Sequence, residues 1–397
     1  MQLVRRGRAA ARRVAVAIAV GVAVPVARLA PQGLPDHLSD AEFWHMVTDF
    51  SEPDGYFRSE NLLSNETGFQ TVIPQLLATV EPGGVYFGVG PEQNFTYIVA
   101  TRPRLAFIID IRHQNAVQHL LYKALIELSD NRADFLARLF SRPRPAGLDA
   151  STSVDSLFAA FAGVAHDSLF YSRTLAAVKD HLVKDHGFAL SQVELQLLEH
   201  NLDAFYEAGP ELSYNFFGGG FGGRGMPTYA ALMMQNDNAG VHRSYLATEA
   251  AYRTLREFEL RNLVVPLTGD FGGSKAIVTA GSYVRTHGAV VTVFYTSNVE
   301  QYLFQDGKWL AFAKNVSTLP LDSTSTFIRS GRAGGGFGGG HAPAPGGGFG
   351  GGHAPAPSGG GGFGGGHSGG GLGGFGGGHG GGGGFGGGHG GGGGGHK

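Results

Sequence analysis

Two short stretches decide the fold class. Residues 85–94 read VYFGVGPEQN, and residues 105–110 read LAFIID. The first is an apolar run of strand length that ends at a Gly-x-Gly turn, after which Pro91 opens a helix at a position where proline is tolerated. The second is a continuous apolar run, typical of a parallel strand buried on both faces, and it ends at Asp110. Together they predict a strand–turn–helix–strand unit.

The strand pattern returns near the end of the body. Apolar runs of strand length at 263–267, 290–295 and 325–328 alternate with helical patterns at 274–286, 299–304 and 309–316. In between, residues 145–260 carry helical periodicity and few strand signals, which is typical of a helical insertion. The fold class expected is α/β, a Rossmann-like mainly parallel sheet with helices on both faces and a large helical insertion at about 145–260.

Composition separates a body from a tail. Of the 68 glycines, 42 follow residue 330, where the unit Phe-Gly-Gly-Gly-His occurs five times. Such a segment buries too little apolar area to offset its ordering entropy, so we expect disorder over 331–397 and a single Rossmann-like domain over 35–330.

The tail also carries histidines: His341, His353, His367, His379, His389 and His396. Imidazoles at this density can bind Ni, Zn or Cu weakly, and the phenylalanines can give weak self-association, although a passive tail is the simplest interpretation. Their spacing builds no preformed site, and no zinc motif is present elsewhere, so no metal ligands are predicted.

The N-terminus has the pattern of an export signal. Five arginines between positions 5 and 13 precede the uncharged apolar run 14–27. That run suits a signal peptide better than a bilayer span, which needs roughly 20 residues. We interpret residues 1–30 as a signal peptide or an N-terminal membrane anchor with 14–27 as the tether, which predicts a periplasmic, extracellular or membrane-anchored protein. A mis-called start codon is the alternative, and it would leave the protein in the cytoplasm.

Charge and cysteine content restrict the function classes. The formal net charge is −2, which gives no basic footprint for nucleic acid. The chain has no Cys, which excludes disulfides, thiolate metal sites and cysteine nucleophiles. A small-molecule ligand is therefore the expected partner, and the oligomeric state is left open.

Polar turns follow the predicted strands at their carboxyl ends, where open parallel sheets bind ligands. The candidate cofactor-binding residues are Gly88, Gly90, Asp110, Asp270, Ser297 and Asn298. Gly88 and Gly90 allow a ligand to approach the backbone and the start of the next helix. Asp110 lies 22 residues after Gly88, at a spacing where an acid accepts both ribose hydroxyls. The pattern predicts a pocket for an adenosine-containing molecule, and the alternative is a tight turn with an N-cap carboxylate.

A polar loop before the first strand is a second candidate region. It crowds hydrogen-bonding side chains into 11 residues, namely Tyr56, Arg58, Asn61, Asn65 and Glu66. The loop could fold over the ligand as a lid, or Ser64 or Asn65 could cap the helix that follows.

Two further charged segments each allow a functional and a structural interpretation. Arg112 and His113, just past Asp110, either contact a ligand or are surface residues, and the Gly-rich stretch 217–225 is a flap with Arg224 at its tip or a connector.

The strand, turn and acid resemble class I S-adenosylmethionine-dependent methyltransferases over about 85–130 and 262–300. The stretches 85–94, 107–114 and 56–66 are also similar to a family of uncharacterised bacterial proteins of related fold, which implies no activity of its own.

The methyltransferase resemblance implies S-adenosylmethionine as cofactor and assigns a role to each candidate. Gly88 and Gly90 would form the loop beside the methionine moiety, and Asp110 would bind the ribose. Asp270 would lie near the adenine amine, and residues 295–298 would reach the substrate.

Three residues depart from the family patterns. Tyr86 stands where methyltransferases usually carry an acid, and Glu92 replaces the third glycine of the loop. Gln93 stands where the dinucleotide fingerprint has its last glycine, so NAD or a nucleotide sugar is the weakest expectation.

The first functional hypothesis is an S-adenosylmethionine-binding transferase whose acceptor the sequence does not name. The alternative is an exported, non-catalytic binding protein on a methyltransferase-like scaffold, because an exported enzyme would lack this cytoplasmic cofactor.

Overall fold

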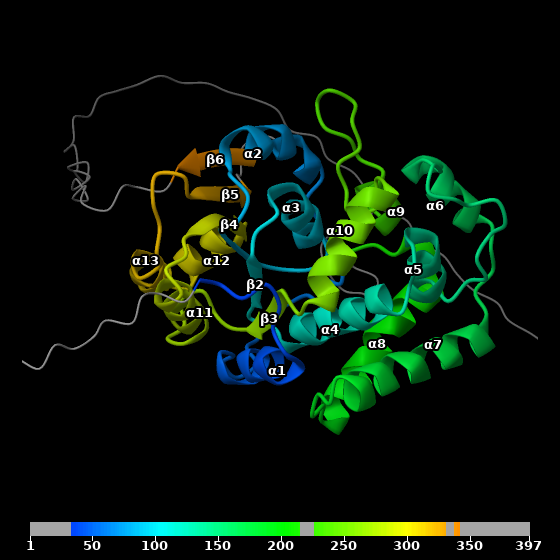
Figure 1. Cartoon of the computed structure of the whole chain (residues 1–397), viewed down its shortest axis with the longest axis horizontal. Helices are drawn as coiled ribbons and strands as arrows, with labels where there is room; N and C mark the ends of the chain where they lie inside the picture. The colour runs from blue at the N-terminus through cyan, green and yellow to red at the C-terminus, as the bar shows by residue number, and fades with distance from the viewer. Residues whose placement is uncertain (1–32, 215–225, 331–336, 342–397) are drawn as a thin grey trace, which may run out of the picture. The chain divides into compact units, whose positions relative to one another are not determined.

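The computed structural model describes residues 33–214, 226–330 and 337–341 (Figure 1). Its centre is a six-stranded sheet in the order β3-β2-β1-β4-β5-β6. The strands are β1 Val85–Gly88, β2 Leu105–Asp110, β3 Val264–Thr268, β4 Val291–Ser297, β5 Thr326–Ser330 and β6 Phe337–His341. The first five run parallel, and β6 pairs antiparallel with β5. The sheet therefore confirms the predicted α/β, mainly parallel, Rossmann-like fold.

The edge strand β6 comes from the glycine-rich segment. Residues 337–341, the first of the five repeats, pair with β5 along their backbone. A glycine-rich backbone still offers the donors and acceptors of a sheet ladder. The remainder of the tail lies outside the described residues.

Helices connect the strands at nearly the positions that the sequence predicts. They are α1 Asp40–Asp49, α2 Ile73–Thr79, α3 Gln93–Thr101, α4 His113–Glu127, α5 Arg132–Leu139, α6 Val154–Ala162, α7 Ser168–Asp180, α8 Gln192–Ala208, α9 Tyr229–Met233, α10 Glu249–Leu260, α11 Ala276–Thr286, α12 Val299–Gln305 and α13 Trp309–Ser317. Two 3₁₀ turns, η1 Phe69–Val72 and η3 Gly209–Glu211, and one π-helical turn, η2 His181–Asp185, complete the described part of the chain.

The two faces of the sheet are covered by different helices (Figure 1). The helices α3, α4 and α10 lie on one side of the strands, and α11 and α13 lie on the other. Consecutive strand residues alternate between these faces, because side chains in a strand point to opposite sides. Phe107 of β2 packs edge-on against Tyr283 of α11 at 6.4 Å, and Phe294 of β4 packs against Phe312 of α13 at 6.2 Å.

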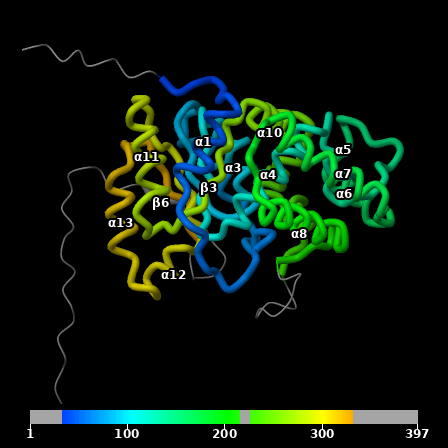
Figure 2. The backbone as a smooth tube through the Cα atoms, turned by 90° about the horizontal axis from the view of Figure 1, so that it is seen from below, coloured from blue at the N-terminus to red at the C-terminus, as the bar shows by residue number. Residues whose placement is uncertain are grey.

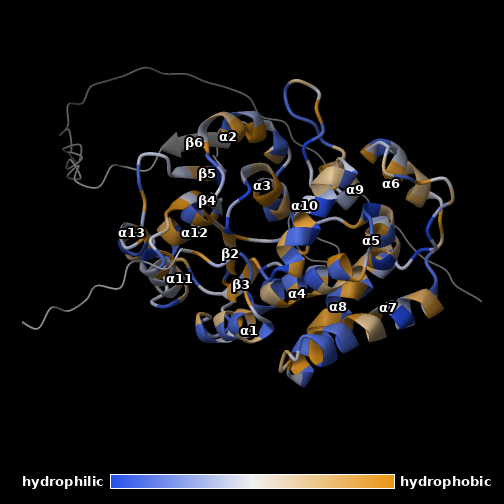
Figure 3. Ribbon diagram, viewed as in Figure 1, coloured by the Kyte–Doolittle hydropathy of each residue, from blue (hydrophilic) through white to orange (hydrophobic). Residues whose placement is uncertain are grey.

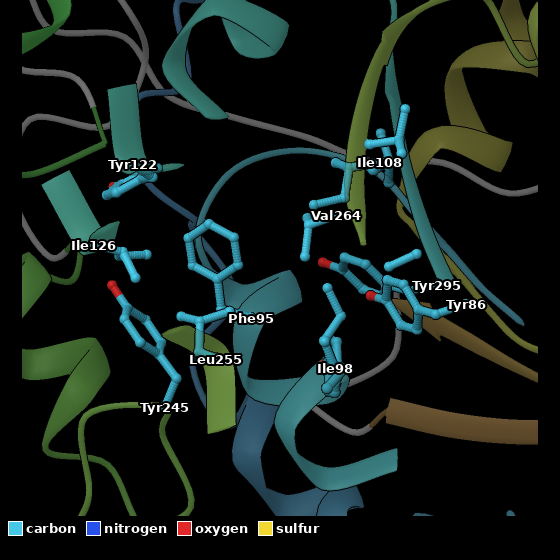
Figure 4. Close-up of a cluster of buried hydrophobic side chains, with 14 of the residues drawn as sticks. Tyr86, Phe95, Ile98, Ile108, Tyr122, Ile126, Tyr245, Leu255, Val264 and Tyr295 are labelled. Carbon is cyan, nitrogen blue, oxygen red and sulfur yellow. The ribbon is translucent and has the colours of Figure 1, made fainter. Parts of the chain in front are cut away.

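The opposite face is closed by an aromatic cluster around Phe95 of α3 (Figure 4). The Phe95 ring lies 5.3 Å from the rings of both Tyr122 and Tyr245. Tyr86 and Tyr295, from the neighbouring strands β1 and β4, lie together on the other side of the same helix (Figure 4). The cluster links the sheet to α4 and to the segment before α10, so it joins the helical insertion to the sheet.

The helical insertion between α4 and α10 extends to one side of the sheet (Figures 1 and 2). Its helices carry mixed hydrophobic and hydrophilic colours, whereas β2 and β3 are mainly hydrophobic (Figure 3). Local signals set where these helices begin, as Ser191 and Glu194 form a reciprocal capping box at α8. Among the described residues, no helix is long and apolar enough to cross a membrane. The predicted signal or tether within 1–30 lies outside them.

Candidate functional site

A pocket opens at the carboxyl ends of the parallel strands, beside the point between β1 and β4 where the strand order reverses. This is the position at which open α/β sheets bind ligands. The pocket encloses about 950 Å³ when its open mouth is included. Its walls bring together eight of the residues predicted from the sequence, namely Tyr56, Asn61, Asn65, Gly90, Asp110, Asp270, Ser297 and Asn298.

Gly88 belongs to the wall behind the pocket rather than to its lining. A Cβ at this position would lie 2.0 Å from Oδ1 of Asn94, so glycine is required for that side chain to pack. The Asn94 amide donates to the carbonyl oxygens of residues 89–91, and its Oδ1 accepts from the Tyr86 hydroxyl at 2.7 Å. Tyr86, which stands where methyltransferases carry an acid, therefore organises the turn. Gly90 has a φ of 80°, which favours glycine.

Asp110 reaches the pocket at the end of β2, but its carboxylate already has a cation beside it. The Arg112 guanidinium donates from Nε to Oδ1 and from Nη2 to Oδ2, both at 3.0 Å. Both side chains are buried, and Arg112 lines the pocket with its Nη1 lacking a partner. The alternative that Arg112 is a surface residue is therefore wrong, because its side chain is buried. The ion pair with Asp110 offsets the cost of burying its charge. His113 contacts Glu194 and Thr268 instead.

Asp270 is paired in the same way on the other side of the pocket. Its Oδ2 accepts from Nζ of Lys308 at 2.6 Å, and its Oδ1 accepts from the N–H of Gly272 at 2.8 Å. Both acids predicted to bind the ligand are thus neutralised by a neighbouring cation. Asp110 Oδ1 also accepts from the backbone N–H of Arg112 at 3.0 Å, so a lone pair for a hydroxyl or amine donor remains on Asp110 Oδ2 and on both oxygens of Asp270.

Carboxylates of the N-terminal loop occupy the starts of two helices at this edge. Glu52 accepts from the N–H groups of Lys275 and Ala276 at 2.6 and 3.2 Å, at the start of α11. Asp54 accepts from the N–H of His113 at 2.7 Å, at the start of α4. Helix N-termini are ready-made anion sites, and here the chain fills two of them with its own carboxylates. Neither acid was predicted from the sequence, since both precede the polar loop 56–66.

Glu92 lies at the start of a third helix at this edge, α3, which follows the Gly-x-Gly turn. Its carboxyl group is fully buried, with Oε1 accepting from the N–H of Ser64 at 3.3 Å and Oε2 lacking a partner. Burial raises the pKa of Glu92 to about 7, although backbone hydrogen bonds oppose this shift. The residue that replaces the third glycine thus brings a carboxyl group to the helix start where dinucleotide-binding folds hold pyrophosphate.

The predicted lid is attached to the end of β4 through Glu66. The hydroxyl of Tyr295 donates to Glu66 Oε2 at 2.6 Å, and Ser297 donates to Oε1. Gln93 donates in turn to the Tyr295 hydroxyl at 3.0 Å. Burial raises the pKa of Glu66, against the opposing effect of these hydrogen bonds. Glu66 therefore fixes the loop beneath the pocket and does not line it.

Arg58 does not line the pocket, but its guanidinium sits 5.7 Å from the ring centre of Tyr302 in α12, which does. The alternative that Ser64 or Asn65 caps the following helix is wrong, because η1 begins after Gly68 without a side-chain cap. The predicted flap around Arg224 lies outside the described residues.

Fold and pocket together define a Rossmann-like α/β protein with a pocket of mixed polar and apolar lining at the switch point of its sheet. The chain belongs to the family described as "Domain of unknown function (DUF7790)", whose model matches residues 62–148 and 221–344. The two matched segments contain all six strands, and the unmatched stretch between them holds α6, α7 and α8 of the helical insertion. No curated protein matches the chain.

Proposed function

We propose that the pocket binds a small molecule that contains adenosine but no phosphate, of the S-adenosylmethionine type, and that the protein is a transferase using it. The proposal is supported first by the position of the pocket at the switch point, between the turn at Gly90 and the acid at Asp110. An acid at the end of the second strand can accept hydrogen bonds from ribose hydroxyls.

The observation that carries the proposal is the set of carboxyl groups at the helix starts. Glu92, Asp54 and Glu52 stand at the starts of α3, α4 and α11, the helices next to β1, β2 and β3 at this edge. At the starts of α4 and α11 a phosphate would meet carboxyl oxygens that already accept from the first N–H groups, and at the start of α3 the residue present is an acid, although its side chain does not bond the N–H groups of that helix. This favours a ligand without phosphate over NAD or a nucleotide sugar.

The charge of the pocket is compatible with such a ligand. Asp110 and Asp270 line it in ion pairs with Arg112 and Lys308, and Asp306 adds a further negative charge that can attract a sulfonium or an ammonium group. Arg112 lines it as well, and a guanidinium is the side chain best suited to a carboxylate such as that of methionine.

A second function, non-catalytic binding of the same type of ligand, is favoured by one observation. Both oxygens of Asp110 already accept from Arg112, and Tyr86 supports the turn where methyltransferases carry an acid. Ligand binding without methyl transfer to any acceptor would favour this alternative.

Isothermal calorimetry of the full-length chain with S-adenosylmethionine and S-adenosylhomocysteine tests the proposal. We expect heat of binding with both, and none with NAD. Asp110→Asn should weaken binding by about tenfold or more, the value of a hydrogen bond to a charged group. The matched control is Asp134→Asn, which loses an Asp–Arg pair to Arg144 away from the pocket. Absence of heat with either ligand would overturn the proposal, and unchanged affinity in Asp110→Asn would overturn the site.

A second variant protects this test, because Asp110→Asn also breaks a buried ion pair and can unfold the protein. Asn298 lines the pocket at the end of β4 and is only partly buried. Asn298→Ala should weaken binding of S-adenosylhomocysteine while the circular dichroism spectrum stays unchanged.

A further inference from the structure

A second polar cluster lies away from the pocket, where the end of α4 meets the segment after α7. Glu127 closes α4, and His181 and His186 flank the π-helical turn η2. The Nε2 atoms of the two histidines lie 2.8 and 2.7 Å from the same oxygen, Oε2 of Glu127. The three ligand atoms all fall within 4.8 Å of one another.

The π-helical turn is the reason why the two imidazoles converge. The N–H of His186 donates to the carbonyl of His181 at 3.0 Å, which is a bond between residues five apart. An α-helix would place such residues on different faces, whereas the wider turn stacks one above the other. The two ring centres are consequently 4.7 Å apart. Single π turns of this kind recur at functional sites.

Each imidazole is also oriented from behind by a carboxylate. Nδ1 of His181 lies 2.8 Å from Asp185, and Nδ1 of His186 lies 2.6 Å from Asp40. Metal-binding histidines have this second contact almost without exception, because it fixes the tautomer and directs the other nitrogen at the metal. His186 is further held by stacking on Phe188, with ring centres 4.9 Å apart.

The Glu127 carboxyl is directed at the Nε2 atoms of both histidines. Its Oε1 accepts from Nζ of Lys123 at 2.6 Å, which leaves Oε2 for the histidines. The Glu127 side chain is 3% exposed, and those of His181 and His186 are 18% and 14% exposed. Solvent therefore reaches the histidine side of the cluster, where water could complete a coordination shell.

We propose that Glu127, His181 and His186 form a site for one divalent transition-metal ion, zinc or a similar ion, with water as the remaining ligand. Two histidines and a glutamate are a ligand set that binds zinc in proteins, with Zn–N distances of about 2.0–2.1 Å. At these distances tetrahedral ligand atoms lie roughly 3.3 Å apart, so the rings would withdraw from Glu127 by about half an ångström. The metal would join α4 to η2, and through Asp40 to α1.

The ordinary alternative is an ion-pair network, in which Glu127 accepts one N–H hydrogen bond from each protonated ring. A divalent cation in place of these two protons would carry the same charge, so both states are electrostatically compatible with the surrounding carboxylates. The two interpretations differ in metal affinity, which makes them separable by titration.

The test is a titration of the full-length chain with Co²⁺, followed by visible absorption, and a thermal melt with Zn²⁺. The double variant His181→Ala/His186→Ala is compared with the matched double variant His45→Ala/His166→Ala, which removes two body histidines outside the cluster. The tail histidines are identical in all three proteins, so any difference comes from the body.

We expect the unmodified chain and the control to show one equivalent of Co²⁺ with the intense bands of a low-coordinate site. Zn²⁺ should raise their Tm by about 3–6 °C at a concentration about 100-fold above the dissociation constant. The His181→Ala/His186→Ala variant should lose both effects, with affinity at least 100-fold weaker. Equal Co²⁺ spectra and equal Tm shifts in all three proteins would overturn the proposal.

A milder variant keeps the test valid if the double variant fails to fold. Glu127→Gln retains the shape of the side chain but replaces a charged ligand, so Co²⁺ affinity should fall by about tenfold or more. Unchanged Co²⁺ affinity in Glu127→Gln would contradict the assignment of this residue as a ligand.

Discussion

Replacing Glu92 by glutamine should remove a pH-dependent cost of folding. The Glu92 carboxyl is fully buried at the start of α3, and its Oε2 has no hydrogen-bond partner. Burial raises its pKa from 4.5 to about 7, against the smaller effect of backbone hydrogen bonds from Glu92 itself and from Ser64. At a pH between these two pKa values the folded protein holds a proton on Glu92 that the unfolded chain has released.

The size of the cost follows from this difference. Below pH 4.5 the carboxyl is protonated in both states, and no stability is lost. Between pH 4.5 and about 7 the stability falls by about 1.4 kcal/mol for each pH unit, because the unfolded chain binds fewer protons. Above about pH 7 the loss is complete. From pH 5 to pH 8 the free energy of unfolding of the wild-type protein should therefore fall by about 2.5 kcal/mol because of Glu92. The Glu92→Gln variant lacks this contribution, because glutamine does not titrate.

Urea unfolding at pH 5 and pH 8 measures this effect, since all other titrating groups cancel between wild type and Glu92→Gln. The free energy of unfolding of the variant, minus that of wild type, should be larger at pH 8 than at pH 5 by about 2.5 kcal/mol, so the variant gains relative stability at the higher pH. Glu81→Gln, which changes an exposed carboxylate, is the matched control and should show no such change. An equal difference between wild type and Glu92→Gln at both pH values would refute the reasoning.

Three further changes test the packing around the pocket. Tyr295→Phe removes the hydroxyl that donates to buried Glu66 and should cost about 1–3 kcal/mol in denaturant unfolding; an unchanged midpoint would contradict that bond. Gly269→Ala places a Cβ 2.3 Å from the Cβ of Ala276 and should cost about 1–3 kcal/mol by the same assay, so a variant as stable as wild type would mean that the two elements are not in contact. Glu52→Gln should weaken the start of α11 by about 1 kcal/mol and speed amide exchange at Ala276, and unchanged exchange there would argue against the cap.

The fold was predictable because its strands are buried on both faces. A parallel strand covered by helices must be apolar throughout, and the runs at 85–87 and 105–109 stand out for that reason. The structure extends them only to Gly88 and Asp110. The strand at 337–341 was not predictable, because its three glycines carry no side-chain pattern and its pairing uses the backbone alone.

The location of the pocket was predictable for a topological reason, whereas its pairings were not. Parallel strands end at one edge of the sheet, so residues after separate strands, such as Asp110 and Ser297, meet there. Nothing in the local sequence marks that Lys308 pairs with Asp270 from a segment 38 residues away, or that Glu52 reaches α11. These contacts depend on how whole elements pack, which a pattern along the chain does not contain.

The central claim is that the pocket beside Gly90 and Asp110 binds an adenosine ligand without phosphate. A crystal structure of the full-length chain grown with saturating S-adenosylhomocysteine tests it most directly. We predict electron density for the ligand between the Gly90 turn and the end of β4, with the ribose hydroxyls at the Asp110 carboxylate. A pocket that remains empty in those crystals, or ligand density at another place on the molecule, would contradict the claim.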